Sequence, residues 1–354
     1  MSDTIEDAVS AVSGDRLMAH LTAFAQWEKP AGTPGERASL EYVRGELDGC
    51  GYATTLIEHD AYISLPGRAR IVADGRDWRA ITQSFSRSSP PEGLTAAAVY
   101  LGAGGEDDYR AADVRGKVVI LDGIATPVAA NRARAHGAVG QIHVSPHEHV
   151  HEMCISPVWG SPSQKTLDLL PTTVVVTTDK ASGDALKARA AEPGFEVTLH
   201  AEVDTGWRKT PILVADMAGP TGAADEPFVF YTGHHDTWYY GVMDNGGANA
   251  TMIEVARVAA EHRATWRRGL RLIFWSGHSH GRYSGSSWYA DTHWAELERD
   301  CAVHVNVDST GGIGNNDLTG APVSAEYTAL ARAVIEAETG QVSRGARLGR
   351  NSDQ

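Results

Sequence analysis

Cysteine is scarce in this chain of 354 residues. The three cysteines, Cys50, Cys154 and Cys301, are far apart and form no CxxC pair. A disulfide-stapled scaffold and a cysteine-based zinc knuckle are therefore excluded, and free thiols in a reducing compartment are expected.

Long apolar runs and basic clusters are also missing. No segment has the roughly 20 consecutive apolar residues that cross a bilayer, and the acidic start MSDTIEDAVS lacks the features of a secretory signal. The net charge is −14, from 31 basic and 45 acidic residues. We therefore expect a cytoplasmic protein, either a monomer or a homo-oligomer, that acts on a small molecule or peptide and binds neither nucleic acid nor membrane.

The composition otherwise fits a globular protein, because 42% of the residues are hydrophobic. Helical patterns near 15–27 and 38–47 lead into a strand at 52–59. Residues from about 65 to 205 then hold short strands, separated by glycine-rich turns and one helix around 130–137. The length and this change of pattern predict one domain formed by 1–62 and 206–354, with a strand-rich domain inserted at 63–205.

From about residue 210, strands and helices alternate regularly. Strands are expected at 227–236, 269–277 and 301–310, and helices at 247–261, 286–300 and 325–338. This alternation predicts an α/β fold with a mixed, mainly parallel sheet and helices on both faces. Ligands of such sheets gather at the carboxyl ends of the strands.

Three of these strands end in side chains of one chemical kind. His234 and Asp236 follow the first, His278 and His280 the second, and Asp308 the third. A fourth residue, Asp244, precedes the helix at 247–261, where it would bind metal or merely cap the helix. Imidazoles and carboxylates arriving from four places are the ligands that zinc and related divalent metals prefer.

The motifs GHHDTW, GVMDNGGANA, RLIFWSGHSHGRYSGSSWYA and VHVNVDSTGG resemble the catalytic core of the zinc exopeptidases that include aminopeptidases, glutamate carboxypeptidase II and the transferrin receptor. The inserted segment resembles their protease-associated domain. This resemblance implies that His234 and Asp308 bind the first metal, that Asp244 bridges two metals, and that Asp236 orients the His234 imidazole.

The chain departs from the family after the second strand, where the family has two adjacent glutamates, a general base and a metal ligand. Counting back from Gly285-Ser286 places His280 on the ligand and Ser279 on the base. Counting forward from Trp275-Ser276-Gly277 places His278 on the base. We expect His280 as a ligand and His278 as the proton acceptor, because imidazole suits both tasks. The inverse assignment and the loss of the second metal stay open.

Two further segments raise alternatives. GRNSDQ at 349–354 resembles a family segment that precedes the distal histidine ligand, so the chain is a fragment, is completed by another chain, or uses one metal. An exposed apolar sheet edge would follow. In IHVSPHEHVHEMC, His147, His149 and His151 alternate, so an extended segment would project them to one side as a metal site, a substrate-facing lip or a polar surface.

The favoured interpretation is a metal-dependent hydrolase in which one or two divalent ions, zinc or a relative, activate water to attack an amide-type bond of a peptide or small molecule. The alternative is a non-catalytic scaffold with a degenerate peptidase fold. The replacements at the altered positions are themselves metal-binding residue types, which favours the enzyme.

Overall fold

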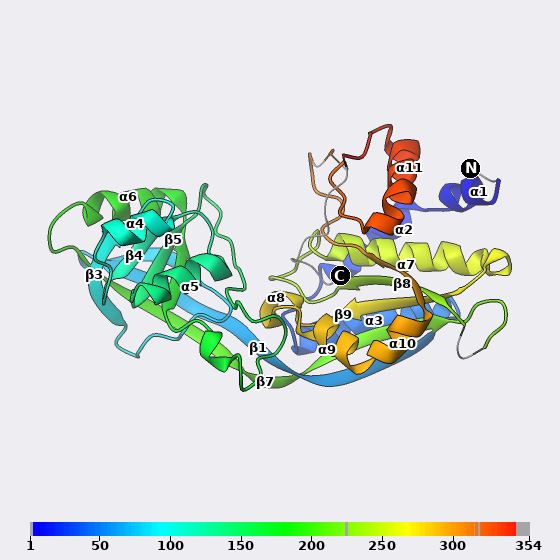
Figure 1. Cartoon of the computed structure of the whole chain (residues 1–354), viewed down its shortest axis with the longest axis horizontal. Coiled ribbons are helices and arrows are strands. Elements are labelled where there is room, and N and C mark those ends of the chain that lie inside the picture. The colour runs from blue at the N-terminus through cyan, green and yellow to red at the C-terminus, as the bar shows by residue number, and fades with distance from the viewer. Residues whose placement is uncertain (1–2, 224–225, 315, 318, 345–354) are drawn as a thin grey trace.

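Two long strands connect the two lobes of the molecule (Figure 1). The computed structural model describes residues 3–223, 226–314, 316–317 and 319–344. In it, β1 (Ala53–Ala73) and β7 (Glu196–Met217) pair antiparallel and run through both lobes. Within the described part, no helix has both the length and the apolar character needed to cross a membrane.

The first lobe contains a mixed sheet in the order β1-β7-β9-β8-β10. Its last three strands, β9 (Gly269–Trp275), β8 (Phe228–His234) and β10 (Cys301–Asn306), are parallel to one another, whereas β7 is antiparallel to β9. Consequently the carboxyl ends of β8, β9 and β10 meet at one edge of the lobe.

Helices cover both faces of this sheet. On one face lie α2 (Gly14–Phe24), α3 (Pro34–Gly49) and α7 (Gly246–Glu261), and on the other α9 (Ser284–Thr292) and α10 (Trp294–Asp300). Along β9, Leu272 and Phe274 belong to the first core, whereas Ile273 and Trp275 belong to the second. This alternation is the period of two expected of a strand buried on both faces.

The strands of the second lobe close on themselves. Pairing passes from β1 through β2, β6, β5, β4 and β3 to β7, which pairs with β1 again. The apolar side chains between them, including Ile71, Ile120, Ile142 and Leu199, are fully buried. The elements are β2 (Arg76–Thr82), β3 (Leu94–Tyr100), α4 (Glu106–Ala111), β4 (Val118–Asp122), α5 (Pro127–Ala135), β5 (Gly140–Val144), β6 (Val174–Thr178) and α6 (Lys180–Ala190).

The mixed α/β architecture expected from the sequence is confirmed, but one helix was placed wrongly. The segment 286–300 forms two helices, α9 and α10, which break at His293. Asp291, Thr292 and His293 all have low helix propensity, which explains the break. The strand expected at 52–59 continues to Ala73, because β7 provides an antiparallel partner along most of that length.

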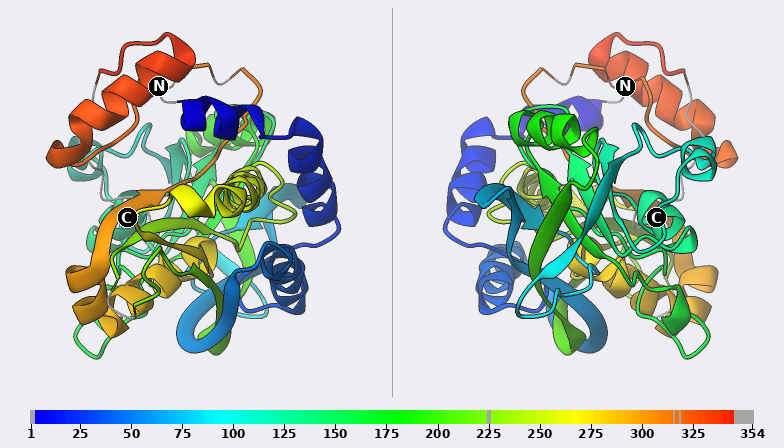
Figure 2. Two further views of the ribbon diagram at one scale, coloured as in Figure 1. Left: turned by 90° about the vertical axis from the view of Figure 1, so that its right-hand side faces the viewer. Right: turned by 90° about the vertical axis from the view of Figure 1, so that its left-hand side faces the viewer.

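The edge of the described sheet is β10, and none of its residues is buried. The next helix, α11 (Thr328–Thr339), stands away from the sheet and also has no buried residue (Figure 2). Val305 on β10 is 43% exposed. The described part of the lobe therefore presents a partly apolar strand edge, as expected.

A loop from the second lobe reaches across to the first. Trp159 stacks on Tyr283 with ring centroids 4.4 Å apart, and the backbone N–H of Gly160 donates to the carbonyl of Arg282 at 2.6 Å. The backbone N–H of Tyr62 on β1 donates to Ser161 Oγ at 3.0 Å. The second lobe is thereby anchored on the turn that follows β9.

A buried carboxylate, Glu254 on α7, holds the N-terminal helices against the sheet. Its side chain is 1% exposed and accepts hydrogen bonds from Ser13 N at 2.8 Å, Arg16 Nε at 3.2 Å and Arg257 Nη2 at 2.6 Å. Burial raises the pKa of this carboxyl, but the hydrogen bonds from Arg257 and Ser13 outweigh burial, so the net pKa lies below its ordinary value.

Glu254→Gln should lower the free energy of unfolding by about 2 kcal/mol at pH 7, because charge-assisted hydrogen bonds are lost. Since the folded pKa is depressed, this stabilisation is present above the ordinary pKa of about 4.3 and is lost as the pH falls through the folded value. Urea unfolding at pH 7 and pH 3 measures both effects. The control Glu261→Gln, whose side chain is 55% exposed, should change stability little; an equal loss at both pH values for Glu254→Gln would contradict the assignment.

Candidate metal centre

The three parallel strand ends bring the expected side chains together. His234 is the last residue of β8, Asp308 follows β10 by two residues, and His278 begins the short helical turn α8 (His278–Gly281) after β9. The ligand atoms of these three residues all lie within 4.8 Å of one another. His234 and His278 stack with ring centroids 3.8 Å apart.

Asp244 joins the same cluster from the loop before α7. Its Oδ1 lies 3.1 Å from His234 Nε2, and Asp308 Oδ1 lies 3.3 Å from the same nitrogen. The alternative role of Asp244 as a helix cap is not observed, because Asn245 is the N-cap residue of α7.

The protonation of His234 follows from its other nitrogen. Nδ1 lies 2.8 Å from the backbone carbonyl of Asp236, which can only accept, so Nδ1 carries the hydrogen. In the neutral ring, Nε2 therefore presents a lone pair to two carboxylates. Neither Nε2 nor Asp244 Oδ1 has a hydrogen-bond partner, although both are buried.

Such a group of electron-rich atoms requires a cation. Burial lowers the pKa of His234, but the carboxylates of Asp244 and Asp308 outweigh it and raise the net pKa, because they favour positive charge at Nε2. The same field favours a metal ion. The residues thus fit a zinc-type divalent cation in donor type and spacing.

The two histidines of α8 lie in different positions relative to the cluster. His278, expected as the proton acceptor, lies in the cluster with His234 and Asp308, whereas His280, expected as the ligand, lies outside it. The reason is local, because each residue of an α-helix is rotated by about 100° from the one before it. Side chains two positions apart in α8 therefore point in nearly opposite directions.

His280 instead lies between two carboxylates. Its Nδ1 is 3.9 Å from Asp236 Oδ2, and its Nε2 is 3.7 Å from Glu152 Oε1. Burial lowers the pKa of His280, but the two carboxylates outweigh burial and raise it overall. The ring also meets Trp238 edge-on, with centroids 4.5 Å apart.

Asp236 orients more than the expected imidazole. Its backbone carbonyl, rather than its carboxylate, contacts His234, and this corrects the sequence-based expectation. The carboxylate accepts from the backbone N–H groups of His278 at 3.0 Å and Ser279 at 2.9 Å. Burial raises its pKa, but the three nearby histidines outweigh burial and lower the pKa to about 2.

Glycines allow α8 to fold back tightly. Gly277 has φ +76°, and a Cβ there would overlap Ser284 Oγ. A Cβ on Gly281 would overlap the same oxygen, and one on Gly285 would overlap the carbonyl of Ser276. The sequence SGHSHGRYSG therefore encodes a compact turn that aims His278 toward β8.

Glu152 was not anticipated from the sequence. It lies at the end of the histidine-rich segment of the second lobe, 126 positions before His278. Tyr239 and Tyr240, which follow β8, are 53% and 49% exposed and therefore do not belong to the core. Burial, together with Glu152, raises the pKa of Tyr239 to about 12.

The histidine-rich segment after β5 is exposed but is not a strand. His147 Nε2 faces His151 Nε2 at 3.1 Å, and the ring centroid of His149 lies 5.6 Å from that of His147. The imidazoles gather because the loop turns, not because it is extended. The GRNSDQ segment lies outside the described residues.

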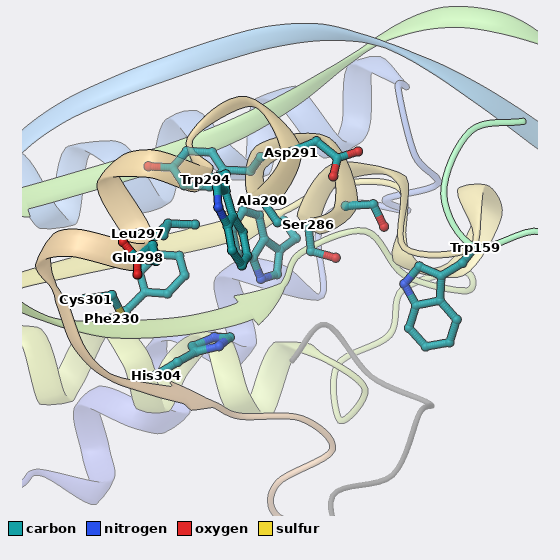
Figure 3. A pocket seen from close by; sticks show the side chains of 13 residues that line it. Trp159, Phe230, Ser286, Ala290, Asp291, Trp294, Leu297, Glu298, Cys301 and His304 are labelled. Atoms are coloured by element: carbon teal, nitrogen blue, oxygen red, sulfur yellow. The ribbon is translucent and has the colours of Figure 1, made fainter. Parts of the chain in front are cut away.

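A separate pocket of about 550 Å³ lies on the face covered by α9 and α10 (Figure 3). Its wall includes Trp159, Phe230, Trp294 and His304. Of the described residues in the metal cluster, none lines it. The metal site expected from the sequence therefore does not lie in this pocket.

Solved structures with the same fold include a peptidase M28 precursor from Shewanella amazonensis and a zinc aminopeptidase from Bacillus subtilis. The first has a TM-score of 0.76 and 17% identity and covers 99% of this chain and 83% of its own. The second has a TM-score of 0.71 and 21% identity and covers 95% and 81%, respectively. These similarities establish the fold.

Sequence relatives include a probable glutamate carboxypeptidase of Zea mays and a probable lipoprotein aminopeptidase of Mycobacterium tuberculosis. Both are 23% identical to this chain over 84% of its length, and they are covered over 50% and 59% of their own lengths. The chain thus spans about half the length of the curated relatives it matches.

The model of "Peptidase family M28" matches residues 213–351, the segment that contributes His234, Asp244, His278 and Asp308. The segment 213–351 is thus similar to peptidase family M28, in agreement with the zinc exopeptidases that its motifs resemble.

Proposed function

We propose that this protein is a metal-dependent hydrolase of an amide bond in a peptide or small molecule. The observation that carries the proposal is the buried Nε2 of His234, whose lone pair faces Asp244 and Asp308 without a hydrogen bond. Similarity to aminopeptidases and carboxypeptidases supports the reaction class.

The residues proposed to hold the ion are His234, Asp244, Asp308 and His278. A bound divalent ion would supply Lewis-acid activation of water and of the scissile carbonyl. Asp236 holds both imidazoles in place, His234 through its carbonyl and His278 through its carboxylate. His280 lies outside the cluster, between Asp236 and Glu152. It would hold or transfer a proton at Nε2.

We also propose that 63–205 acts as a protease-associated-like domain beside this site. Glu152 from that segment contacts His280, and Trp159 packs on Tyr283. These contacts support a role for the second lobe in shaping the substrate site. The number of ions is proposed as one, because His280 lies apart from the described cluster.

The first test is turnover. Zinc-loaded protein should hydrolyse members of a panel of aminoacyl p-nitroanilides and dipeptides. His234→Ala should reduce kcat/KM by more than about 100-fold, since even residues that only orient metal ligands cost 10- to 100-fold. The exposed His149→Ala is the matched control and should retain activity. Zinc bound without turnover of any panel member would favour the scaffold alternative.

A second test separates the two histidines of α8. His278→Ala should weaken zinc affinity by about 100-fold or more, because a donor of the cluster is lost. His280→Gln should weaken it by about 10-fold or less, through α8 alone. Competition with a chromophoric chelator measures both affinities. The reverse order would restore the assignment of His280 as ligand.

A further inference from the structure

Arg282 is a half-buried arginine without an acidic partner among the described residues. It directly follows α8, and its guanidinium carbon lies 5.0 Å from the centroid of the Tyr283 ring and 5.5 Å from that of Trp159. Its Nε is buried and donates no hydrogen bond. A buried donor left unpaired in this way is costly unless a ligand or water completes it.

Arg282 lines a pocket of about 520 Å³ between the two lobes. The pocket is also lined by Asn131 and Arg132 of α5, by His136 just after it, by Glu106 at the start of α4, and by Pro157 in the loop that crosses from the second lobe.

The other charges of this pocket are already engaged. Glu106 lies 3.5 Å from Arg132 Nε and 3.1 Å from His136 Nε2, and Arg132 Nη1 also donates to the carbonyl of Gly104 at 2.7 Å. Within the described part of the chain, Arg282 is therefore the lining cation left without a counter-ion. An anion is the ligand that this pocket lacks.

The pocket adjoins the proposed metal site through Tyr283. The centroid of the Tyr283 ring lies 4.8 Å from that of the His278 ring, and the Arg282 guanidinium carbon lies 5.0 Å from the same Tyr283 centroid. A peptide spans about 3.3–3.6 Å per residue, so two or three residues bridge roughly 7–11 Å. A short peptide with an amide bond at the cluster can thus extend a carboxylate to Arg282.

We propose that Arg282 binds a carboxylate of a short peptide substrate in this pocket and so selects substrates with an anionic group a few residues from the scissile bond. Guanidinium suits the task because it pairs with carboxylate through two parallel hydrogen bonds. The carboxylate comes from the peptide C-terminus or from an acidic side chain. This inference rests on the proposed function for the position of the scissile bond.

The test measures binding rather than turnover. The full chain, freed of metal by a chelator, is titrated calorimetrically with Ala-Ala-Ala, with its C-terminal amide and with Ala-Ala-Asp-amide. The free acid should bind about 10- to 100-fold more tightly than the amide, as expected for loss of a charge-assisted pair. Tight binding of Ala-Ala-Asp-amide would identify the side chain as a further source of the carboxylate.

Variants assign the effect to Arg282. Arg282→Gln should abolish the difference between acid and amide, and Arg282→Lys should restore part of it. The control Arg134→Gln, on α5 but outside the pocket, should bind like the unmodified protein. Equal binding of acid and amide, no binding of either, or an unchanged difference in Arg282→Gln would overturn the proposal.

The outcome is separable from the proposed function. If the protein discriminates between the acid and the amide but hydrolyses no substrate, the proposed hydrolase activity is wrong and the proposed carboxylate site stands. If the zinc-loaded protein hydrolyses substrate but does not discriminate, the hydrolase activity stands and the carboxylate site is wrong. Zinc content should be the same in Arg282→Gln and in the unmodified protein, because Arg282 is not a metal ligand.

Discussion

The hydrogen bond from His234 Nδ1 to the backbone carbonyl of Asp236 fixes the chemistry of the centre. It decides that Nε2 is the nitrogen with the lone pair, and it turns that lone pair toward Asp244 and Asp308. Three buried or half-buried acceptors then share a small space, which is unfavourable unless a cation joins them. The carboxylate of the same aspartate holds α8, so one residue positions both imidazoles.

The fold makes this arrangement possible by placing β8 between β9 and β10, all parallel. The residues that follow each of these three strands therefore lie at the same edge of the sheet. The two apolar cores on either face of the sheet keep these strands in register, and the glycine-rich turn after β9 lets α8 fold back over β8. The second lobe adds Glu152 and Trp159 through a loop that is far away in the sequence.

Much of this could be predicted from the sequence. The regular alternation of apolar strands and amphipathic helices predicts the first lobe. Polar residues after two strands and before the helix at 247–261 predict that His234, Asp308 and Asp244 lie together. The sequence could not decide between His278 and His280, because the choice depends on whether residues 278–281 form an open loop or a helical turn. The sequence could not show that Glu152 faces His280, since that contact joins the two lobes. The break between α9 and α10 was missed because the apolar pattern continues across three weak helix formers.

The location of the bound metal tests the central claim most directly. Crystals of zinc-loaded protein, measured at the zinc absorption edge, should show an anomalous peak within about 2.0–2.3 Å of His234 Nε2, an imidazole nitrogen of His278 and a carboxylate oxygen of Asp308. A peak coordinated by His280 in place of His278, or no peak at the ends of β8 and β10, would contradict the account.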